Sequence, residues 1–283
     1  MRENHINKTG GLFKIFAYCI CVLLGVMSIL PFWVMFMNAT RSTFEIQGQA
    51  FSLLPSNDLM NNFGVLEGKP FEPWIGFINS LTISAGATIC AVYFSALTAY
   101  ALVAYKWKAR NGFFAFIMAV MMIPAQVTTI GFYQFMWSIG MTNSFLPLIL
   151  PAVASPAIVF FMRQYLFATL SIDIVNSGRI DGAGEFHIFN AIILPIMKPA
   201  IATQAIFVFV TSWNNFFMPL ILLTNKDMYT MPIMVSLLRG DIYKTEFGAV
   251  YLGLSLSVLP LFVMYFTLSR YIIAGVALGG VKE

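Results

Sequence analysis

NGFFAFIMAVMMIPAQVTTIGFYQFMWSIGMTNSFLPLILPAVASPAIVFFM, residues 111–162, contains no acidic, basic or histidine side chain. One helical crossing of the hydrocarbon core of a bilayer takes about 20 apolar residues, so this stretch is too long for a single transmembrane helix. The polar sequence SIGMTNS at 138–144 divides it, and we predict two membrane spans, near 113–136 and 146–165. The stretch therefore indicates a membrane protein that crosses the bilayer several times.

The rest of the chain has the same character. Of its 283 residues, 59% are hydrophobic and 10% are charged, whereas soluble domains carry roughly 25% charged residues. This composition excludes a soluble globular protein. Uncharged runs predict further spans near 15–37, 78–104, 200–223 and 248–269. We therefore expect an all-α fold with six transmembrane helices in a single domain over residues 1–283.

The first predicted span could instead be a cleavable signal peptide, because the basic residues Arg2, Lys8 and Lys14 precede it. Its apolar run is much longer than the roughly 7–15 residues of a signal-peptide core, and no clear small-residue cleavage motif follows. An uncleaved transmembrane helix is therefore favoured.

Basic side chains are distributed unevenly over the segments between the predicted spans. With both termini in the cytoplasm, eleven lysines and arginines lie on the inner side and five on the outer side. Cytoplasmic loops of membrane proteins carry an excess of Lys and Arg, so this orientation is predicted. The sequence YKWKAR at 105–110 contributes most clearly to it, and the outer segment 38–74 is net negative.

The predicted cytoplasmic loop, residues 166–199, contains a polar, glycine-rich stretch, SGRIDGAGEFHIF at 177–189. Asp181-Gly182 is a turn sequence, so a helix, a turn and a second helix are predicted over 172–190, with Asp181 as the N-cap of the second helix. The small residues around the turn would let the backbone of a partner approach closely. On these features alone, a solvated turn without a partner fits better, because Asp-Gly turns are common.

After the turn, apolar residues recur at helical spacing from Ile188 to Leu194 and would hold the loop against the membrane helices. LPIMKPA at 194–200 is predicted to break and restart the helix at its two prolines.

The same loop resembles that of binding-protein-dependent ABC transporter permeases, whose pattern runs roughly E-A-A-x-x-D-G-A and then an apolar stretch ending in I-x-L-P and K-P. Asp181-Gly182-Ala183 matches the centre of the pattern, Phe189 its aromatic position, and LPIMKP at 194–199 its end. Further sequences occur in the order typical of the carbohydrate-uptake, maltose-type branch: NSLTIS at 79–84, AYAL at 99–102, MIPAQ at 122–126, TSWNNFFMPLILL at 211–223 and YIIAGVALGGVKE at 271–283.

The loop departs from the family pattern at its first positions. Asn176-Ser177-Gly178 stands in place of Glu-Ala-Ala, and Ser171 stands where a proline is usual. A role that depends on the family's glutamate therefore does not carry over to Asn176.

The resemblance implies the type I ABC importer permease fold and a loop that docks on a separate ATPase. It further implies a second homologous permease, two ABC ATPase subunits, an extracytoplasmic solute-binding protein and a bacterial or archaeal inner membrane. ATP and Mg would be bound by the ATPase, and this chain contains no G-x-x-x-x-G-K-[ST] phosphate loop. The residues predicted to contact the ATPase are Asn176, Ser177, Gly178, Asp181, Gly182, Ala183, Gly184 and Glu185.

Uncharged polar and aromatic side chains within the predicted spans are candidates for the path of a neutral sugar, because amides bind hydroxyl groups and aromatic faces cover C–H surfaces. These candidates are Asn79, Gln126, Tyr133, Gln134, Gln204, Trp213, Asn214 and Asn215. For each of them, a hydrogen bond between helices or an anchor at the membrane interface is the alternative role. A carbohydrate, and more specifically an oligosaccharide, is the expected substrate, and glycerol 3-phosphate is the alternative.

Other functional classes fit less well. Ion-coupled secondary transporters keep ionisable residues within the bilayer, and the interiors of the predicted spans have none. The histidines, His5 and His187, do not stand in a metal-ligand spacing, and no catalytic constellation lies at membrane depth. We therefore predict no enzymatic activity, no cofactor or metal site and no nucleic-acid partner for this chain.

Overall fold

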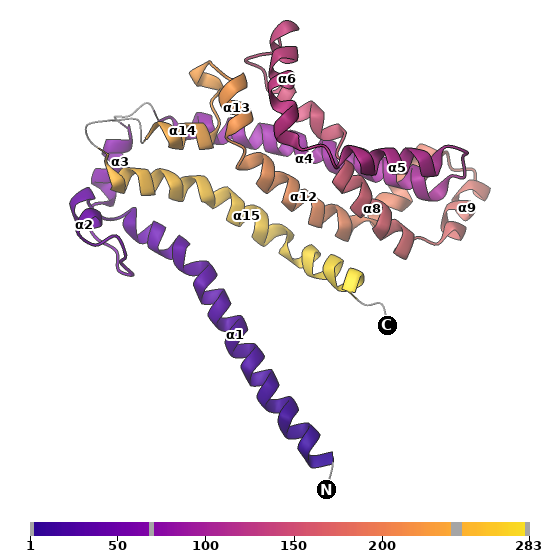
Figure 1. Ribbon diagram of the computed structural model, residues 1–283, viewed down its shortest axis with the longest axis horizontal. Helices are drawn as coiled ribbons and strands as arrows, with labels where there is room; N and C mark the ends of the chain where they lie inside the picture. The colour runs from indigo at the N-terminus through magenta and orange to yellow at the C-terminus, as the bar shows by residue number, and fades with distance from the viewer. Residues whose placement is uncertain (1–2, 68–70, 239–244, 281–283) are drawn as a thin grey trace. The chain divides into compact units, whose positions relative to one another are not determined.

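The computed structural model describes residues 3–67, 71–238 and 245–280, and over these ranges the chain forms helices joined by loops, without a β-strand (Figure 1). The longest helices are α1 (Glu3–Asn38), α4 (Pro73–Ala104) and α15 (Phe247–Gly280). The predicted all-α fold class is confirmed. The other α-helices are α2 (Thr43–Gly48), α3 (Leu59–Glu67), α5 (Arg110–Val120), α6 (Ala125–Ser138), α7 (Leu146–Ile149), α8 (Pro156–Thr169), α9 (Ile172–Ile180), α10 (Glu185–Ile188), α11 (Leu194–Ile196), α12 (Lys198–Trp213), α13 (Phe217–Leu222) and α14 (Met231–Leu237).

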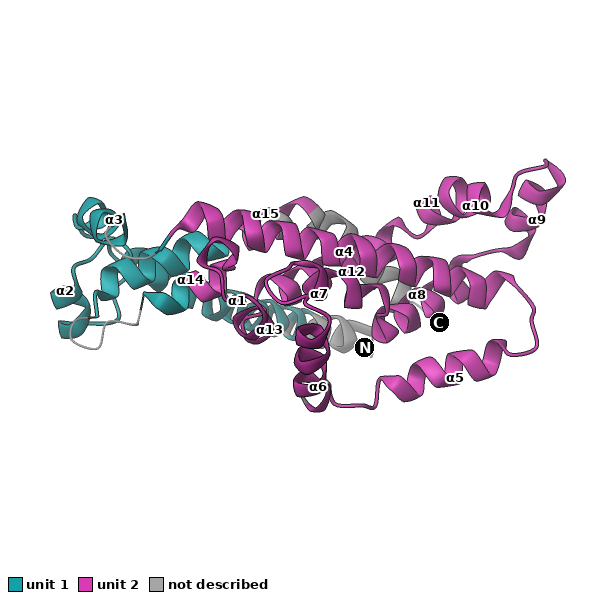
Figure 2. Ribbon diagram, turned by 90° about the horizontal axis from the view of Figure 1, so that it is seen from above, with its two compact units in different colours: residues 1–71, 235–258 teal, residues 72–234, 259–283 magenta. Residues whose placement is uncertain are grey.

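The chain divides into two compact units, which Figure 2 shows in different colours. Unit 1 contains residues 1–71 and 235–258, and unit 2 contains residues 72–234 and 259–283. The sequence predicted a single domain over 1–283. Unit 2 holds the polar loop.

Four helical stretches of the described residues are long and apolar enough to cross a bilayer: Phe13–Asn38, Pro73–Ala104, Leu146–Thr169 and Phe247–Thr267. A fifth crossing is possible where Glu185–Ile196 and Lys198–Trp213 follow each other at a bend of 80°. These stretches overlap five of the six predicted spans, so the count of six stays a prediction.

The predicted continuous helix over 113–136 is wrong. The structure has two shorter helices there, α5 and α6, separated by residues 121–124. Pro124 provides the physical reason, because proline lacks a backbone N–H and disfavours the helical conformation of the residue before it. Pro124 is the N-cap of α6, with an extended backbone at ψ 125°.

The predicted span 200–223 is also interrupted. Helix α12 ends at Trp213, and α13 begins at Phe217. The residues between them include Asn214 and Asn215, whose short amide side chains compete with the helical backbone for hydrogen bonds. The restart at LPIMKPA is as predicted, since α11 ends at Ile196 and α12 begins at Lys198.

Helix α4 is the central helix of unit 2 and packs along α8 and α12. Its buried face consists largely of small side chains, among them Ser84, Ala91, Ser95 and Ala99. In a bilayer, small residues allow helix backbones to approach closely and gain van der Waals contact. This explains how a long apolar helix finds specific neighbours among other apolar helices.

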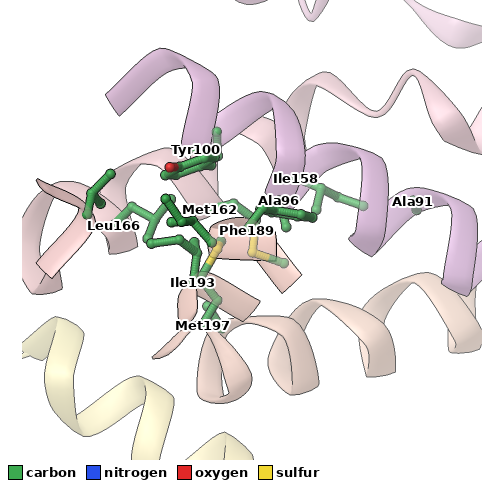
Figure 3. Packing of buried hydrophobic residues seen from close by; sticks show 13 residues of the cluster. Ala91, Ala96, Tyr100, Ile158, Met162, Leu166, Phe189, Ile193 and Met197 are labelled. Atoms are coloured by element: carbon green, nitrogen blue, oxygen red, sulfur yellow. The ribbon is translucent and has the colours of Figure 1, made fainter. Parts of the chain in front are cut away.

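A buried cluster near the C-terminal end of α4 joins this helix to α8 and to the polar loop (Figure 3). Tyr100 of α4 is 2% exposed, Met162 and Leu166 of α8 are fully buried, and Phe189 of the loop is 1% exposed. The Tyr100 and Phe189 rings lie 5.8 Å apart between centroids. The loop is therefore anchored to the membrane helices by side-chain packing.

Unit 1 contains a folded polar cap, residues 38–62, after α1. Arg41 of this cap is 7% exposed. Its guanidinium group donates to Asn38 Oδ1 at 3.0 Å and to the backbone carbonyl oxygens of Glu45 and Gln49 at 3.1 and 2.8 Å. These bonds offset much of the cost of burying the positive charge.

Candidate functional site

The predicted cytoplasmic loop folds into a defined segment, residues 171–197, which we call the coupling segment. It consists of α9, a turn at 181–184, the single turn of α10, a π-helix at Phe189–Ile193 and the short α11. This agrees with the helix, turn and helix predicted over 172–190.

The predicted N-cap role of Asp181 is wrong. Asp181 ends α9 as its C-cap, and its backbone N–H donates to the carbonyl of Ser177 at 3.0 Å. The residue before α10 is Gly184, which provides no side-chain cap. The second helix begins at Glu185, later than the sequence suggested, so the carboxyl group of Asp181 lies too early in the chain to cap α10.

Two glycines in and beside the turn have different structural roles. Gly182 has φ +80°, which L-residues with a side chain rarely adopt. Gly178 is buried, and a Cβ there would lie 3.3 Å from side-chain atoms of both Ile188 and Ile192. Gly178 therefore allows α9 to pack closely on the helical part that follows.

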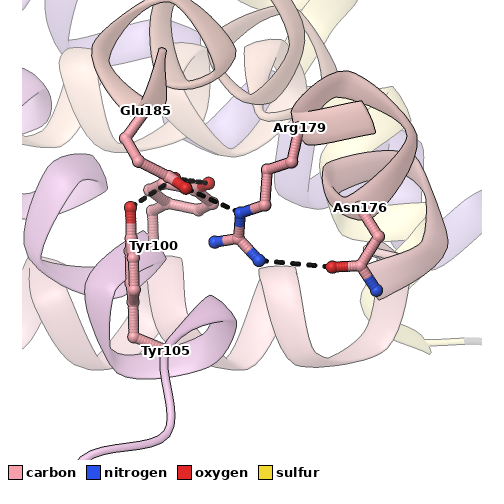
Figure 4. Close-up of polar contacts among 5 residues, drawn as sticks. All are labelled: Tyr100, Tyr105, Asn176, Arg179 and Glu185. Atoms are coloured by element: carbon pink, nitrogen blue, oxygen red, sulfur yellow. Dashed lines mark hydrogen bonds and ion pairs between the residues drawn. The ribbon is translucent and has the colours of Figure 1, made fainter. Parts of the chain in front are cut away.

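A polar cluster joins the coupling segment to the end of α4 (Figure 4). Arg179 Nε donates to Glu185 Oε1 at 2.6 Å, and the hydroxyl groups of Tyr100 (3.2 Å) and Tyr105 donate to Glu185 Oε2. Arg179 Nη1 also donates to Asn176 Oδ1 at 3.2 Å. One carboxylate therefore links α9, α10 and the C-terminal end of α4.

The electrostatics of the cluster follow from these bonds. The pKa of Glu185 lies below its usual value because Arg179 and then Tyr105 donate to the ionised carboxylate. The pKa of Tyr105 is raised by burial and by its bond to Glu185. Near neutral pH Glu185 is ionised and Tyr105 carries its proton, which is the state in which both groups bond as observed.

The eight residues predicted to contact an ATPase do not all lie at the surface. Asn176, Ser177, Asp181, Gly182 and Gly184 are exposed, Ala183 is half-buried and Gly178 is buried. Glu185 is exposed, but its carboxylate is bonded within the chain. Among these eight residues, those open to a partner are therefore the exposed residues of α9 and the turn.

Sequence reasoning missed Tyr100, Tyr105 and Arg179 as members of this site. Tyr105 opens the YKWKAR link and Tyr100 lies in AYAL, so each occurred in a stretch that was singled out for another reason. No local pattern indicates that a tyrosine 80 residues before Glu185 will reach its carboxylate.

Of the predicted substrate-path residues, Asn79 and Trp213 are occupied by contacts within unit 2. The Asn79 amide donates to the backbone carbonyls of Asp227 and Tyr229 at 2.9 and 3.0 Å. The Trp213 side chain is 2% exposed and contacts the rings of Phe77 and Phe209. Both side chains fit the alternative structural role that the sequence left open.

The other predicted path residues lie elsewhere in unit 2. Tyr133 and Gln134 are on α6, with Tyr133 half-buried and Gln134 exposed. Asn214 is exposed after α12, and Asn215 Oδ1 accepts from the N–H of Met218 at 3.4 Å. The remaining two are Gln204, half-buried on α12, and Gln126, whose backbone lies in α6 and whose side chain lies outside the described residues.

The two ends of α4 have different surroundings. Near its N-terminal end, Asn79 bonds to residues 227 and 229, and Ser80 Oγ accepts from the N–H of Met231 at 2.8 Å. At its C-terminal end, Tyr105 bonds to the coupling segment. Residues 227–231, which are predicted to be extracellular, and the coupling segment, which is predicted to be cytoplasmic, therefore lie at opposite ends of this helix.

A scan against protein families matches residues 91–277 to the binding-protein-dependent transport system inner membrane component. The Arabinooligosaccharides transport system permease protein AraQ of Halalkalibacterium halodurans is 32% identical over 261 residues, which cover 92% of this chain and 93% of that protein. The sn-glycerol-3-phosphate transport system permease protein UgpE of Salmonella typhi is 28% identical over 280 residues, covering 95% of this chain and 97% of that protein.

Among solved structures, a bacterial ABC transporter involved in the import of the acidic polysaccharide alginate contains a similar chain. The TM-score is 0.79 at 20% sequence identity, and the match covers 93% of this chain and 98% of that chain. At this identity the likeness shows a shared fold.

Proposed function

This chain belongs to the family of binding-protein-dependent transport system inner membrane components, and on that premise we propose that it is the permease subunit of an ATP-driven importer of an oligosaccharide. The observation that carries the proposal is the 32% identity to AraQ along nearly the whole of both chains. The coupling segment supports it further, because it is a compact element fixed to the membrane helices by a buried cluster.

An oligosaccharide fits helices α4 and α12 better than an anion does, whereas α8 carries Arg163, whose guanidinium group lies 4.1 Å from the centroid of the Phe114 ring. Helix α4 contains no charged residue, and the only charged residue of α12 is Lys198 at its first position. A neutral sugar needs hydrogen bonds and aromatic faces, whereas a phosphate needs fixed cations. The similarity to UgpE nevertheless makes glycerol 3-phosphate the second candidate.

The proposed mechanism is alternating access in a larger assembly. This permease pairs with a second, homologous permease. Two ATPase subunits dock on the cytoplasmic side of the pair, and a solute-binding protein delivers the sugar from the outer side of the membrane. ATP binding draws the ATPases together and moves the coupling segment, and helices of the permease then rotate as bodies so that the cavity opens outward.

We place both termini in the cytoplasm. The distribution of eleven basic residues inside and five outside supports this orientation. The surroundings of α4 are consistent with it, since residues 227–231 and the coupling segment, which are predicted on opposite sides of the membrane, lie at opposite ends of that helix.

Purification of the complex with its binding protein tests the substrate. We expect mass spectrometry of the ligand that the binding protein retains to identify a neutral oligosaccharide. Glycerol 3-phosphate in that site would select the second candidate. Uptake by reconstituted vesicles without any ATPase subunit would contradict the proposed function itself.

A bulky residue on the turn tests the docking surface. Gly184 has φ −70°, and a Cβ added there would have no other atom within 4 Å, so Gly184→Trp adds bulk without backbone strain. We expect this variant to enter the membrane normally and to lose the ATPase during co-purification. Gly184→Ala is the matched control and should keep the ATPase. If the Trp variant also keeps it, the turn is not the docking surface.

A further inference from the structure

We propose that Glu185 is a positioning residue that fixes the coupling segment to the end of α4, so that displacement of the segment is transmitted to that helix. The inference rests on the proposed function and concerns the path by which movement enters the membrane helices. It assigns to Glu185 a role within this chain, in place of the contact with an ATPase that the sequence suggested.

Glu185 accepts hydrogen bonds from residues of two other elements. Its two carboxylate oxygens are both used: Oε1 accepts from Arg179 of α9, and Oε2 accepts from Tyr100 and Tyr105 at the end of α4. Arg179 also lies over the ring of Tyr105, at 5.5 Å from its centroid. Hydrogen bonds to ionised groups are shorter and stronger than those between neutral groups.

Tyr100 connects the buried cluster to Glu185. Its ring is 2% exposed within the cluster that contains Phe189 and Met162, while its hydroxyl group reaches Glu185 at the edge of that cluster. Tyr100 cannot move away from α4, because it is part of that helix. A carboxylate held by this hydroxyl group is therefore held by α4 itself.

Buried apolar contacts and hydrogen bonds restrain the coupling segment in different ways. Buried apolar contacts resist separation but allow sliding, since they have little directional preference. Directional bonds at the edge of the cluster fix the register of α9 and α10 relative to α4. Glu185 lies on α10 and bonds to both α9 and the end of α4.

Spin labels on the complex with its ATPase and binding protein test this role. After replacement of Cys19, Cys21 and Cys90, one label is placed at Ser171→Cys before α9 and one at Lys108→Cys beyond α4; both natural side chains are exposed. The probes are Mg²⁺ with ATP, and the same with vanadate. In the otherwise unchanged protein we expect a narrow distance distribution that the nucleotide leaves unaltered.

Glu185→Ala should loosen this attachment. We expect the population with separated labels to rise about tenfold, the factor that corresponds to about 1.4 kcal/mol and is close to the value of one hydrogen bond to a charged group. Tyr105→Phe removes one hydroxyl group and keeps the ring, so its effect should be smaller. Glu185→Gln keeps the shape and one acceptor oxygen and should restore much of the narrow distribution.

Asp173→Ala is the matched control, because Asp173 is an exposed acid of α9 and should leave the distance unchanged. A Glu185→Ala variant with the same distance distribution as the control overturns the inference while the proposed function stands. A parent complex that binds no ATPase, or whose remaining helices do not respond to nucleotide, overturns the proposed function and this inference with it.

Discussion

Gly248 lies where the start of α15 meets the polar cap of unit 1. A Cβ at this position would lie 2.4 Å from Asn62 Oδ1 and 2.5 Å from the carbonyl oxygen of Arg41. The amide of Asn62 is itself held by bonds to the carbonyls of Ala39 and Arg41, both at 2.9 Å. The cap therefore cannot move aside without losing buried hydrogen bonds.

We predict that Gly248→Ala destabilises the protein by about 1–3 kcal/mol, the usual cost of overpacking a well-packed site. Thermal unfolding in detergent measures this. Gly64→Ala on α3 is the control, because no atom lies within 4 Å of its Cβ position and alanine favours a helix. An unchanged melting temperature for the Gly248 variant would show that the cap adjusts freely.

At the scale of elements, the helical part of the coupling segment is held by one face. Phe189 is 1% exposed and contacts the rings of Tyr93 and Tyr100, whereas Phe186, three residues earlier, is 70% exposed. The π-helix at Phe189–Ile193 widens the backbone at this point, and its buried members Phe189 and Ile193 face the cluster.

We predict that Phe189→Ala lowers the stability of the protein by about 3–5 kcal/mol, as expected when a large buried aromatic side chain leaves a cavity. Phe186→Ala should change it by no more than about 0.5 kcal/mol, which is typical of exposed positions. The two melting temperatures in detergent are the measurement. Equal losses would mean that the cluster does not hold the segment.

Several elements were predictable from the sequence because their signals are local. The end of α9 near Asp181-Gly182 and the break between Ile196 and Lys198 follow from glycine and proline, whose backbone limits act on single residues. The break at Pro124 belongs to the same class, but the apolar run around it was interpreted as one continuous span. That interpretation followed the apolar composition of the run and neglected the effect of Pro124 on the helical backbone.

The candidate site was predictable only in part. The coupling segment was located from its polarity and its resemblance to a known pattern, and its apolar attachment followed from the helical spacing between Ile188 and Leu194, whereas its polar bonds to α4 were not predicted. Tyr100, Tyr105 and Glu185 meet because α4 and the segment pack together over a buried cluster, which is a property of the tertiary fold. The amide of Asn79 illustrates the same limit, since a polar side chain in a span shows no sign of which backbone it bonds.

At the scale of the whole molecule, the orientation in the membrane is open to a direct test. We predict that a membrane-impermeant thiol reagent labels Lys226→Cys in intact cells and labels Lys108→Cys only after the membrane is permeabilised. Both natural residues are exposed, and the measurement requires replacement of Cys19, Cys21 and Cys90. The opposite labelling pattern would reverse the proposed orientation.

The 80° bend at Met197 has a consequence for the lipid that surrounds unit 2. A force along the axis of α10 and α11 is nearly perpendicular to α12, so it swings α12 sideways and hardly slides it along its own length. Sliding would carry apolar side chains out of the hydrocarbon and polar termini into it, which costs free energy in proportion to the mismatch. A sideways swing would change the tilt of α12 while its two ends stay near their own membrane interfaces.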